Sequence, residues 1–178
     1  MSKFEIAVST LLLGFILGQA VDFIKYRWAI HRKKKGVVDE ISDICEEFAE
    51  RFSRIETILH EINNVEVSGS WTPSVISSVI YERYYADVAP FFSRKERKSI
   101  DVIYSCVSNF NDEVENGKRN SLQSTNNSLI SLYASSRMGH GSAVFFEEHR
   151  GEKLLSESKD ELAEINKSIQ QLAEKYYA

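Results

Sequence analysis

The feature that most constrains this chain is an apolar run over residues 4–24 that ends in a dense cluster of cations. Five residues in the run are polar or charged: Glu5, Ser9, Thr10, Gln19 and Asp22. As a helix rising about 1.5 Å per residue, the run is roughly 30 Å long, which matches the hydrocarbon core of a bilayer. The sequence therefore predicts one N-terminal transmembrane helix.

The residues that follow this run predict its orientation. Six cations lie between Lys25 and Lys35, with His31 among them, and Tyr26 and Trp28 are interleaved at the depth that aromatic rings favour. We call this segment, residues 25–35, the basic collar. Its expected membrane-interface residues are Lys25, Arg27, Trp28, Arg32, Lys33, Lys34 and Lys35. Because positive flanks stay in the cytoplasm, we expect a single-pass protein of the inner (cytoplasmic) membrane, with its N-terminus outside.

A cleaved signal peptide is the competing interpretation. Gly18-Gln19-Ala20 has the small-x-small pattern that signal peptidase accepts. However, Lys3 is the single cation before the run and Glu5 offsets it, and the basic collar would follow the cleavage point and resist export. These features favour a retained anchor.

The predicted span carries a small and polar strip on one face. Gly14 and Gly18 form a G-x-x-x-G motif. At about 100° per residue, the following residues share an arc of about 120° with them: Ala7, Thr10, Asp22 and Lys25. Small residues let helices approach closely, and polar strips in membranes tend to face a partner or a water-filled cavity.

This strip predicts self-association into a homo-oligomer. The residues expected to line a pore or to pack between helices are Thr10, Gly14, Gly18, Gln19 and Asp22. The alternative is that glycine is simply common in membrane helices, and that Gln19 and Asp22 already lie among the lipid headgroups.

Composition and charge indicate the fold class of the rest of the chain and limit its possible partners. The sequence has only 2 Pro and 8 Gly, which suits long helices better than many short strands. Residues 1–35 have seven Lys/Arg against two acidic residues, whereas residues 36–178 have fifteen against twenty-four. Because binding to phosphates needs a basic face, we expect no DNA partner, and any RNA contact would be local.

Apolar residues at steps of three and four predict a helical bundle after the collar. A long amphipathic helix covers residues 37–62, ends at Asn63-Asn64, and can continue from the membrane helix because only Gly36 separates them. A second helix is expected to start at Pro73, with Thr72 as its cap, and to stop at Pro90. A capping box at Ser93 and Glu96 starts a third helix that reaches Val114.

The C-terminal third shows weaker signals. Residues 116–128 are polar and predict a loop, followed by a short helix over residues 129–136. Gly139-His140-Gly141 is expected to break the chain, and one or two helices interrupted near Gly151 should complete an antiparallel bundle. The fold class expected is all-α, with a membrane segment over residues 1–35 and a cytoplasmic helical domain over residues 36–178.

Motifs for the common enzymes are missing from the sequence. It has no P-loop, no G-x-G-x-x-G, no His-Glu-x-x-His and no nucleophile elbow. No cofactor and no metal site is expected. Cys45 and Cys106 lie far apart on apolar stripes, which favours buried reduced thiols over a disulfide or a metal site.

Arg54 and His60 form the one catalytic pattern. Five residues separate them, a spacing that resembles the R-x(4-6)-H signature of HEPN ribonucleases, all-helical proteins that pair two motifs across a dimer. In such a site the His moves the 2′-hydroxyl proton and the Arg holds the scissile phosphate. The pattern departs from the family because Ile55 follows the Arg and because the motif falls in the first cytoplasmic helix. Two polar residues on a solvated helix face are the alternative, which we favour.

The whole combination resembles a family of small membrane-anchored accessory proteins encoded beside the RNA-guided RNase of type VI-B CRISPR systems. The features that carry this resemblance are chain length, one N-terminal membrane helix, the basic collar, the helical domain and the divergent Arg54/His60 motif. The resemblance implies a ring-shaped oligomer that forms a membrane pore and strengthens antiviral defence. The partners would be the lipid bilayer, further copies of the chain, and the RNA-guided RNase or RNA.

Three functional hypotheses follow. The chain is a pore or membrane effector without enzymatic activity, a membrane-tethered HEPN-type ribonuclease that depends on Arg54 and His60, or a tethered adaptor. The polar strip favours the first, in which Thr10, Gly18, Gln19 and Asp22 line or gate a channel.

Overall fold

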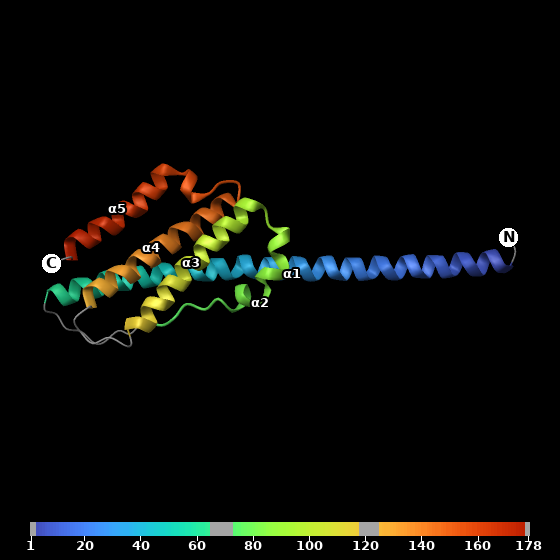
Figure 1. The fold of residues 1–178 in the computed structure, drawn as a ribbon, viewed down its shortest axis with the longest axis horizontal. Helices are drawn as coiled ribbons and strands as arrows, with labels where there is room; N and C mark the ends of the chain where they lie inside the picture. The colour runs from blue at the N-terminus through green and yellow to red at the C-terminus, as the bar shows by residue number, and fades with distance from the viewer. Residues whose placement is uncertain (1–2, 65–72, 118–124, 177–178) are drawn as a thin grey trace.

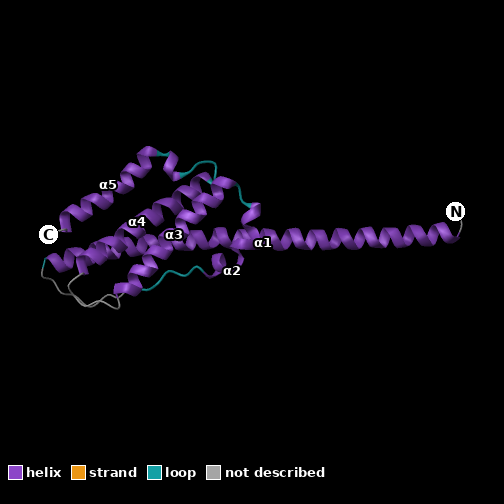
Figure 2. Ribbon diagram, in the orientation of Figure 1, coloured by secondary structure: helices purple, strands orange, loops and turns teal. Residues whose placement is uncertain are grey.

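Apolar residues recurring every three or four positions produce helices throughout the part of the chain that is described. The computed structural model describes residues 3–64, 73–117 and 125–176, and within these ranges there is no strand (Figure 2). The elements are α1 (Lys3–Asn63), α2 (Val79–Val88), the 3-10 turn η1 (Ala89–Phe91), α3 (Arg94–Gly117), α4 (Thr125–His149), the 3-10 turn η3 (Leu155–Glu157) and α5 (Lys159–Tyr176). The all-α prediction is confirmed.

Helix α1 joins the apolar run to the bundle without a break. It is 61 residues long, or about 90 Å at 1.5 Å per residue, and it passes straight through Gly36. Its first half projects away from the other helices, and its second half lies among them (Figure 1). The second half buries six residues of the predicted stripe: Val37, Ile41, Ile44, Phe48, Ile55 and Leu59. The other two differ, since Phe52 is half-buried and Ile62 is 43% exposed. The predicted continuation across Gly36 is therefore confirmed.

Helix α4 is the centre of the bundle. It packs against α1, α3 and α5 and runs in the direction opposite to all three (Figure 1). The predicted stripe of α3, from Ile100 to Val114, is buried, and the Phe110 ring meets the Phe48 ring of α1 edge to face at 6.3 Å between centroids. The core thus lies mainly between α1, α3 and α4, with Val88 of α2 and Leu172 and Tyr176 of α5 at its edges.

Both cysteines lie in this core as free thiols, as the sequence predicted. Burial raises the pKa of Cys106 to about 11, and burial together with the nearby Glu147 and Glu46 carboxylates raises that of Cys45 to about 11. At neutral pH both thiols are protonated, so they behave as small apolar side chains.

The predicted break at Gly139-His140-Gly141 is wrong, because α4 continues through it and absorbs the predicted short helix over residues 129–136. Gly139 allows α4 to pack closely against α1. A Cβ atom at Gly139 would collide with three ring atoms of Phe48, whose side chain is fully buried. Sequence patterns alone cannot separate a packing glycine from a helix-breaking one.

Two other boundaries differ from the prediction. Residues 73–78 form no regular structure and α2 begins at Val79, so the helix start at Pro73 is wrong; Thr72 lies outside the described residues. The predicted polar loop is wrong at both ends, because residues 116–117 belong to α3 and residues 125–128 belong to α4; residues 118–124 lie outside the described part.

The capping box at the start of α3 is confirmed. The Ser93 amide donates to Glu96 Oε2 at 2.6 Å, and the Glu96 amide donates to Ser93 Oγ at 3.1 Å. The predicted interruption near Gly151 is confirmed as well. Gly151 has a φ of +80°, and a Cβ there would lie 3.0 Å from the Glu96 amide nitrogen, so the end of α4 packs directly on the start of α3.

Gly139→Ala tests the close packing of α4 on α1. Alanine raises helix propensity by roughly 1 kcal/mol, but the collision with the buried Phe48 ring should outweigh this and lower the free energy of unfolding by about 1–3 kcal/mol. Gly141→Ala is the matched control, because a Cβ there meets only the side chain of Ile165, led by its terminal methyl. Thermal unfolding of both variants in detergent measures the difference. Equal midpoints for the two variants would contradict the packing argument.

Candidate functional site

The apolar half of α1 is bare in the single chain. Among the described residues, one helix is long and apolar enough to cross a membrane, and none of its most apolar 18-residue window is buried. Leu11, for example, is 74% exposed. A Cβ added at Gly14 or Gly18 would meet nothing within 4 Å, so packing within one chain does not require glycine at either position.

The predicted pore residues all lie on this bare half and are exposed: Thr10, Gly14, Gly18, Gln19 and Asp22. Because α1 is one continuous helix, their positions around its axis follow from about 100° per residue. Thr10, Gly14, Gly18 and Asp22 stay within one arc. Gln19 lies about 180° from Thr10 but about 60° from Asp22, so it is outside this arc, beside the Asp22 edge.

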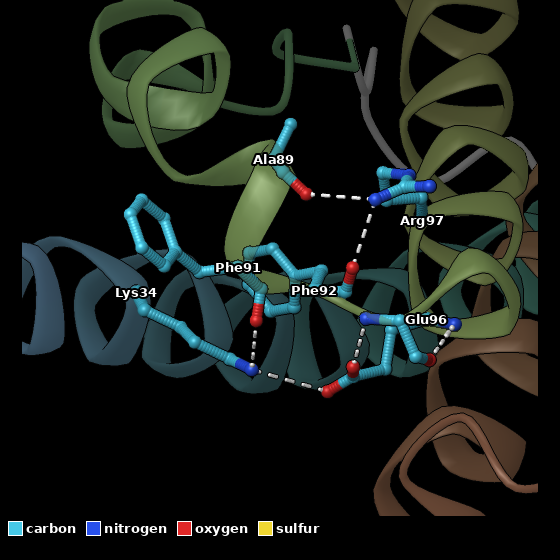
Figure 3. Close-up of polar contacts among 7 residues, drawn as sticks. Lys34, Ala89, Phe91, Phe92, Glu96 and Arg97 are labelled. Atoms are coloured by element: carbon cyan, nitrogen blue, oxygen red, sulfur yellow. Dashed lines mark hydrogen bonds and ion pairs between the residues drawn. The ribbon is translucent and has the colours of Figure 1, made fainter.

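Two residues of the basic collar tie α1 to the bundle. Lys34 Nζ donates to the Phe91 carbonyl at 3.0 Å, pairs with Glu96 Oε1 at 3.4 Å, and lies 4.3 Å from the centroid of the Phe92 ring (Figure 3). Lys33 Nζ pairs with Asp87 Oδ2 at 2.6 Å. These two lysines therefore have structural partners in addition to any role at a membrane.

Arg97 completes this junction from the α3 side. Its Nη1 donates to the carbonyls of Ala89 at 3.2 Å and Phe92 at 2.9 Å (Figure 3). Lys34 and Arg97 thus hold three carbonyls around the η1 turn, where Pro90 prevents a regular helix from continuing. The turn is fixed between α1 and α3.

Glu40 is the buried anchor behind the junction. Its Oε1 accepts the Ile80 amide at 2.8 Å, and its Oε2 accepts the Tyr81 amide at 2.8 Å and the Tyr104 hydroxyl at 2.6 Å. The side chain is 7% exposed. Burial, and then the hydrogen bond to Glu40, raise the pKa of Tyr104 far above its usual value, so the phenol stays a donor. One carboxylate thereby joins α1, the start of α2, and α3.

Sequence reasoning missed Glu40, although a signal was present. Position 40 lies three residues after Val37 and four before Ile44, so it shares the buried stripe of α1. A carboxylate on such a stripe needs buried donors. Its partners could not be read from the sequence, because they come from helices 40 and 64 residues further along.

Two clefts flank α1 at the collar. The larger, of about 330 Å³, lies between α1 and α2 and is lined by Trp28, Ala29, Arg32, Lys33, Gly36, Ile80 and Tyr84. The smaller, of about 210 Å³, lies on the η1 side and is lined by Tyr26, Arg27, Ile30, His31, Lys34 and Phe91. Both combine aromatic walls with cations at the end of the apolar run.

The other collar residues are exposed: Lys25, Arg27, Trp28, Arg32 and Lys35. The Arg32 guanidinium lies over the Trp28 ring, 5.0 Å from its centroid, and the Arg27 guanidinium lies 5.8 Å from the Phe23 centroid. Neither arginine forms a hydrogen bond or ion pair with the described residues, so their N–H groups remain available for a ligand.

Arg54 and His60 do not converge in the single chain. Both are exposed on α1, and their spacing on a continuous helix places them about 120° apart around the axis and about 9 Å apart along it. Among the described residues, the His60 ring nitrogens contact Asn64 Nδ2 alone, at 3.1 and 3.0 Å. Residues 3–64, 73–117 and 125–176 contain no group of three His, Cys, Asp or Glu side chains that could hold a metal ion.

Comparison with protein-family models, with curated proteins and with solved structures found no match to this chain. The site is therefore interpreted from its own geometry.

Glu40→Gln should destabilise the junction. The amide has one acceptor oxygen where the carboxylate has two, so at least one buried donor loses its partner, and we expect a loss of about 1–3 kcal/mol in unfolding free energy. Glu50→Gln, the same change at an exposed position of α1, should stay within about 0.5 kcal/mol of the wild type. Thermal unfolding compares the two, and equal stabilities would remove the role assigned to Glu40.

His60→Ala tests the ribonuclease hypothesis. Because the Arg54/His60 motif departs from the HEPN pattern at Ile55 and in its position along the chain, we expect purified wild-type and variant proteins to behave alike toward single-stranded RNA without added metal. Particle size, measured in parallel, controls for assembly. Cleavage by the wild type that disappears in His60→Ala at unchanged particle size would refute this expectation.

Proposed function

We propose that this protein is a single-pass membrane effector whose copies assemble into a pore. In this proposal residues 4–24 of α1 cross the cytoplasmic membrane, the N-terminus lies outside, and the bundle lies in the cytoplasm. The observation that carries the proposal is the continuity of α1, which is both the bare apolar segment and the core helix of the bundle. A displacement of the bundle is thus transmitted directly to the span.

Three features support insertion into a membrane. The bare half of α1 has the length and composition of a span, and none of the described helices covers it. Cations and aromatic residues follow it at the depth of the lipid headgroups. The attachment of Lys33 and Lys34 to α2, η1 and α3 would hold the bundle against the cytoplasmic surface.

Assembly through the small and polar strip accounts for residues that the single chain leaves unexplained. Gly14 and Gly18 have open space where a side chain would be, which suits a close crossing with another copy. In a closed ring, Asp22 would lie near the inner mouth and favour cations, whereas Lys25, about one turn further along, would oppose them. Gln19, outside the arc and beside its Asp22 edge, would face neighbouring helices or lipid.

The resemblance to the type VI-B accessory proteins gives this pore a biological setting. In that setting the pore would strengthen antiviral defence when an RNA-guided RNase is active, with that RNase or RNA as a partner of the bundle. The departures of the Arg54/His60 motif from the HEPN pattern, with Ile55 after the Arg and a position in the first helix of the bundle, favour this non-enzymatic function over a tethered ribonuclease.

Gly14→Leu and Gly18→Leu test the assembly. A Leu side chain would push crossing helices apart and remove dispersion contacts, so we expect the detergent-solubilised particle to shrink and membrane permeability in cells to fall. Insertion should persist, since both changes raise hydropathy. Ala20→Leu is the matched control, because this small residue lies outside the strip and should preserve both readouts.

Each outcome decides between hypotheses. A wild-type particle with the mass of one chain would rule out the pore. A large particle that does not make the membrane permeable would support the tethered adaptor instead of the pore. Unchanged assembly and permeability in both Leu variants would mean that the bundle alone holds the oligomer and that the G-x-x-x-G motif is incidental.

A further inference from the structure

We propose that the larger cleft at the collar, between α1 and α2, binds the phosphate headgroup of an anionic phospholipid. The residues that would form this headgroup cleft are Trp28, Arg32, Lys33, Gly36, Ile80 and Tyr84. The proposal rests on the insertion of α1 into the membrane. It adds a specific ligand site to what would otherwise be a diffuse positive flank.

The shape of the headgroup cleft suits a small anionic group with an apolar tail. Its volume of about 330 Å³ falls within the range of small-ligand sites. Trp28, Ile80 and Tyr84 provide apolar walls. Gly36 adds no side chain to the floor, where a Cβ would come into van der Waals contact with Ile80 Cγ2, at 3.4 Å.

Arg32 is the residue we expect to hold the phosphate. Helical side chains lean toward the N-terminus, and the Arg32 guanidinium indeed lies over the Trp28 ring, one turn nearer the apolar run. Trp28 is about 6 Å past Ile24 along the helix axis, within the headgroup layer of a leaflet. The guanidinium therefore lies at the depth of lipid phosphates, with its planar fork of N–H groups unoccupied.

The ion pair between Lys33 and Asp87 limits how strongly the headgroup cleft binds a phosphate. The Lys33 ammonium is paired with Asp87 at 2.6 Å, so the carboxylate neutralises the second cation. The pair is partly exposed, with the Asp87 side chain at 55% of its full accessibility, and so it is a weak one. A phosphate entering the cleft competes with Asp87 for Lys33. Removing the Asp87 charge should then strengthen binding.

The smaller cleft on the η1 side is the poorer candidate. Its Lys34 already donates to the Phe91 carbonyl and pairs with Glu96. Its volume is also about 210 Å³, smaller than that of the headgroup cleft. Arg27 in this cleft has N–H groups as available as those of Arg32, so the small volume, below the usual range of small-ligand sites, and the engaged Lys34 make this cleft the poorer candidate.

The experiment measures lipid retained by the full-length protein. Wild type and variants are reconstituted in vesicles of phosphatidylcholine alone or with phosphatidylglycerol, extracted in mild detergent, and analysed by native mass spectrometry. Because a charge-assisted hydrogen bond contributes a factor of about ten or more, Arg32→Gln should reduce retained phosphatidylglycerol about tenfold. Asp87→Asn should increase retention. Phosphatidylcholine should not be retained above background in any variant.

Matched controls separate a specific site from general attraction to a charged surface. Arg94→Gln makes the same change at an exposed position at the start of α3, and Asp39→Asn makes the other change at an exposed position of α1. Both should retain phosphatidylglycerol as the wild type does. Equal losses in Arg32→Gln and Arg94→Gln, or equal gains in Asp87→Asn and Asp39→Asn, would overturn the headgroup cleft.

Two further measurements complete the test. One tells whether the bound phosphate belongs to a lipid or is a free anion, and the other tells whether a negative result contradicts membrane insertion or the headgroup cleft alone. Inorganic phosphate at millimolar concentration should not displace the lipid; complete displacement would mean that the cleft binds a free anion. Alkaline carbonate extraction of membranes reports insertion independently. Release of the wild type by carbonate would defeat the membrane function itself, whereas retention without a difference between Arg32→Gln and Arg94→Gln would defeat the cleft alone.

Discussion

The buried carboxylate of Glu40 is the interaction on which the junction between α1 and the bundle depends. It accepts the first free amides of α2 and the hydroxyl of Tyr104, and so it fixes α2 against α1 and α3 at once. An ionised group in such a place needs several donors to offset its lost hydration, and three are present. With α2 held, Asp87 and the Phe91 carbonyl come within reach of Lys33 and Lys34. Both the tie at the collar and the shape of the two flanking clefts follow from this one contact.

Because α1 is continuous, the junction connects the apolar half of this helix rigidly to the bundle. A helix of 61 residues with no break at Gly36 behaves as one stiff element, and its second half is locked by buried contacts from Val37 to Leu59. The first half is bare in the single chain, so anything that covers it must come from outside the chain. The proposed pore and the proposed lipid site use one face of this helix at different depths, because Trp28, Arg32 and Gly36 follow Thr10, Gly14 and Gly18 by 18 residues, or about five whole turns. Assembly uses the level of Gly14 and Gly18, and the headgroup cleft uses the level of the basic collar.

Close packing explains where the sequence misled. The sequence Gly139-His140-Gly141 is typical of a helix break. Yet the fully buried Phe48 ring occupies the place where a side chain at position 139 would be. The segment 73–78 looks like a helix start because of Pro73, yet α2 begins only where Glu40 can accept its amides. In both places a partner distant in sequence outweighed a local preference. Where the signal was local and reciprocal, as in the capping box of Ser93 and Glu96, the prediction was confirmed.

The sequence by itself determined the helical fold class, the long α1, the stripes that form the core, and the succession of an apolar run and a basic collar. These depend on periodicity and composition, which are properties of neighbouring residues. The tertiary structure alone decided which collar residues are engaged by the bundle and which remain open. Lys33, Lys34 and Arg32 are near-equivalent in the sequence. They differ because Asp87, Phe91 and Glu96 come from other elements, and only folding brings those acceptors to two of the three cations.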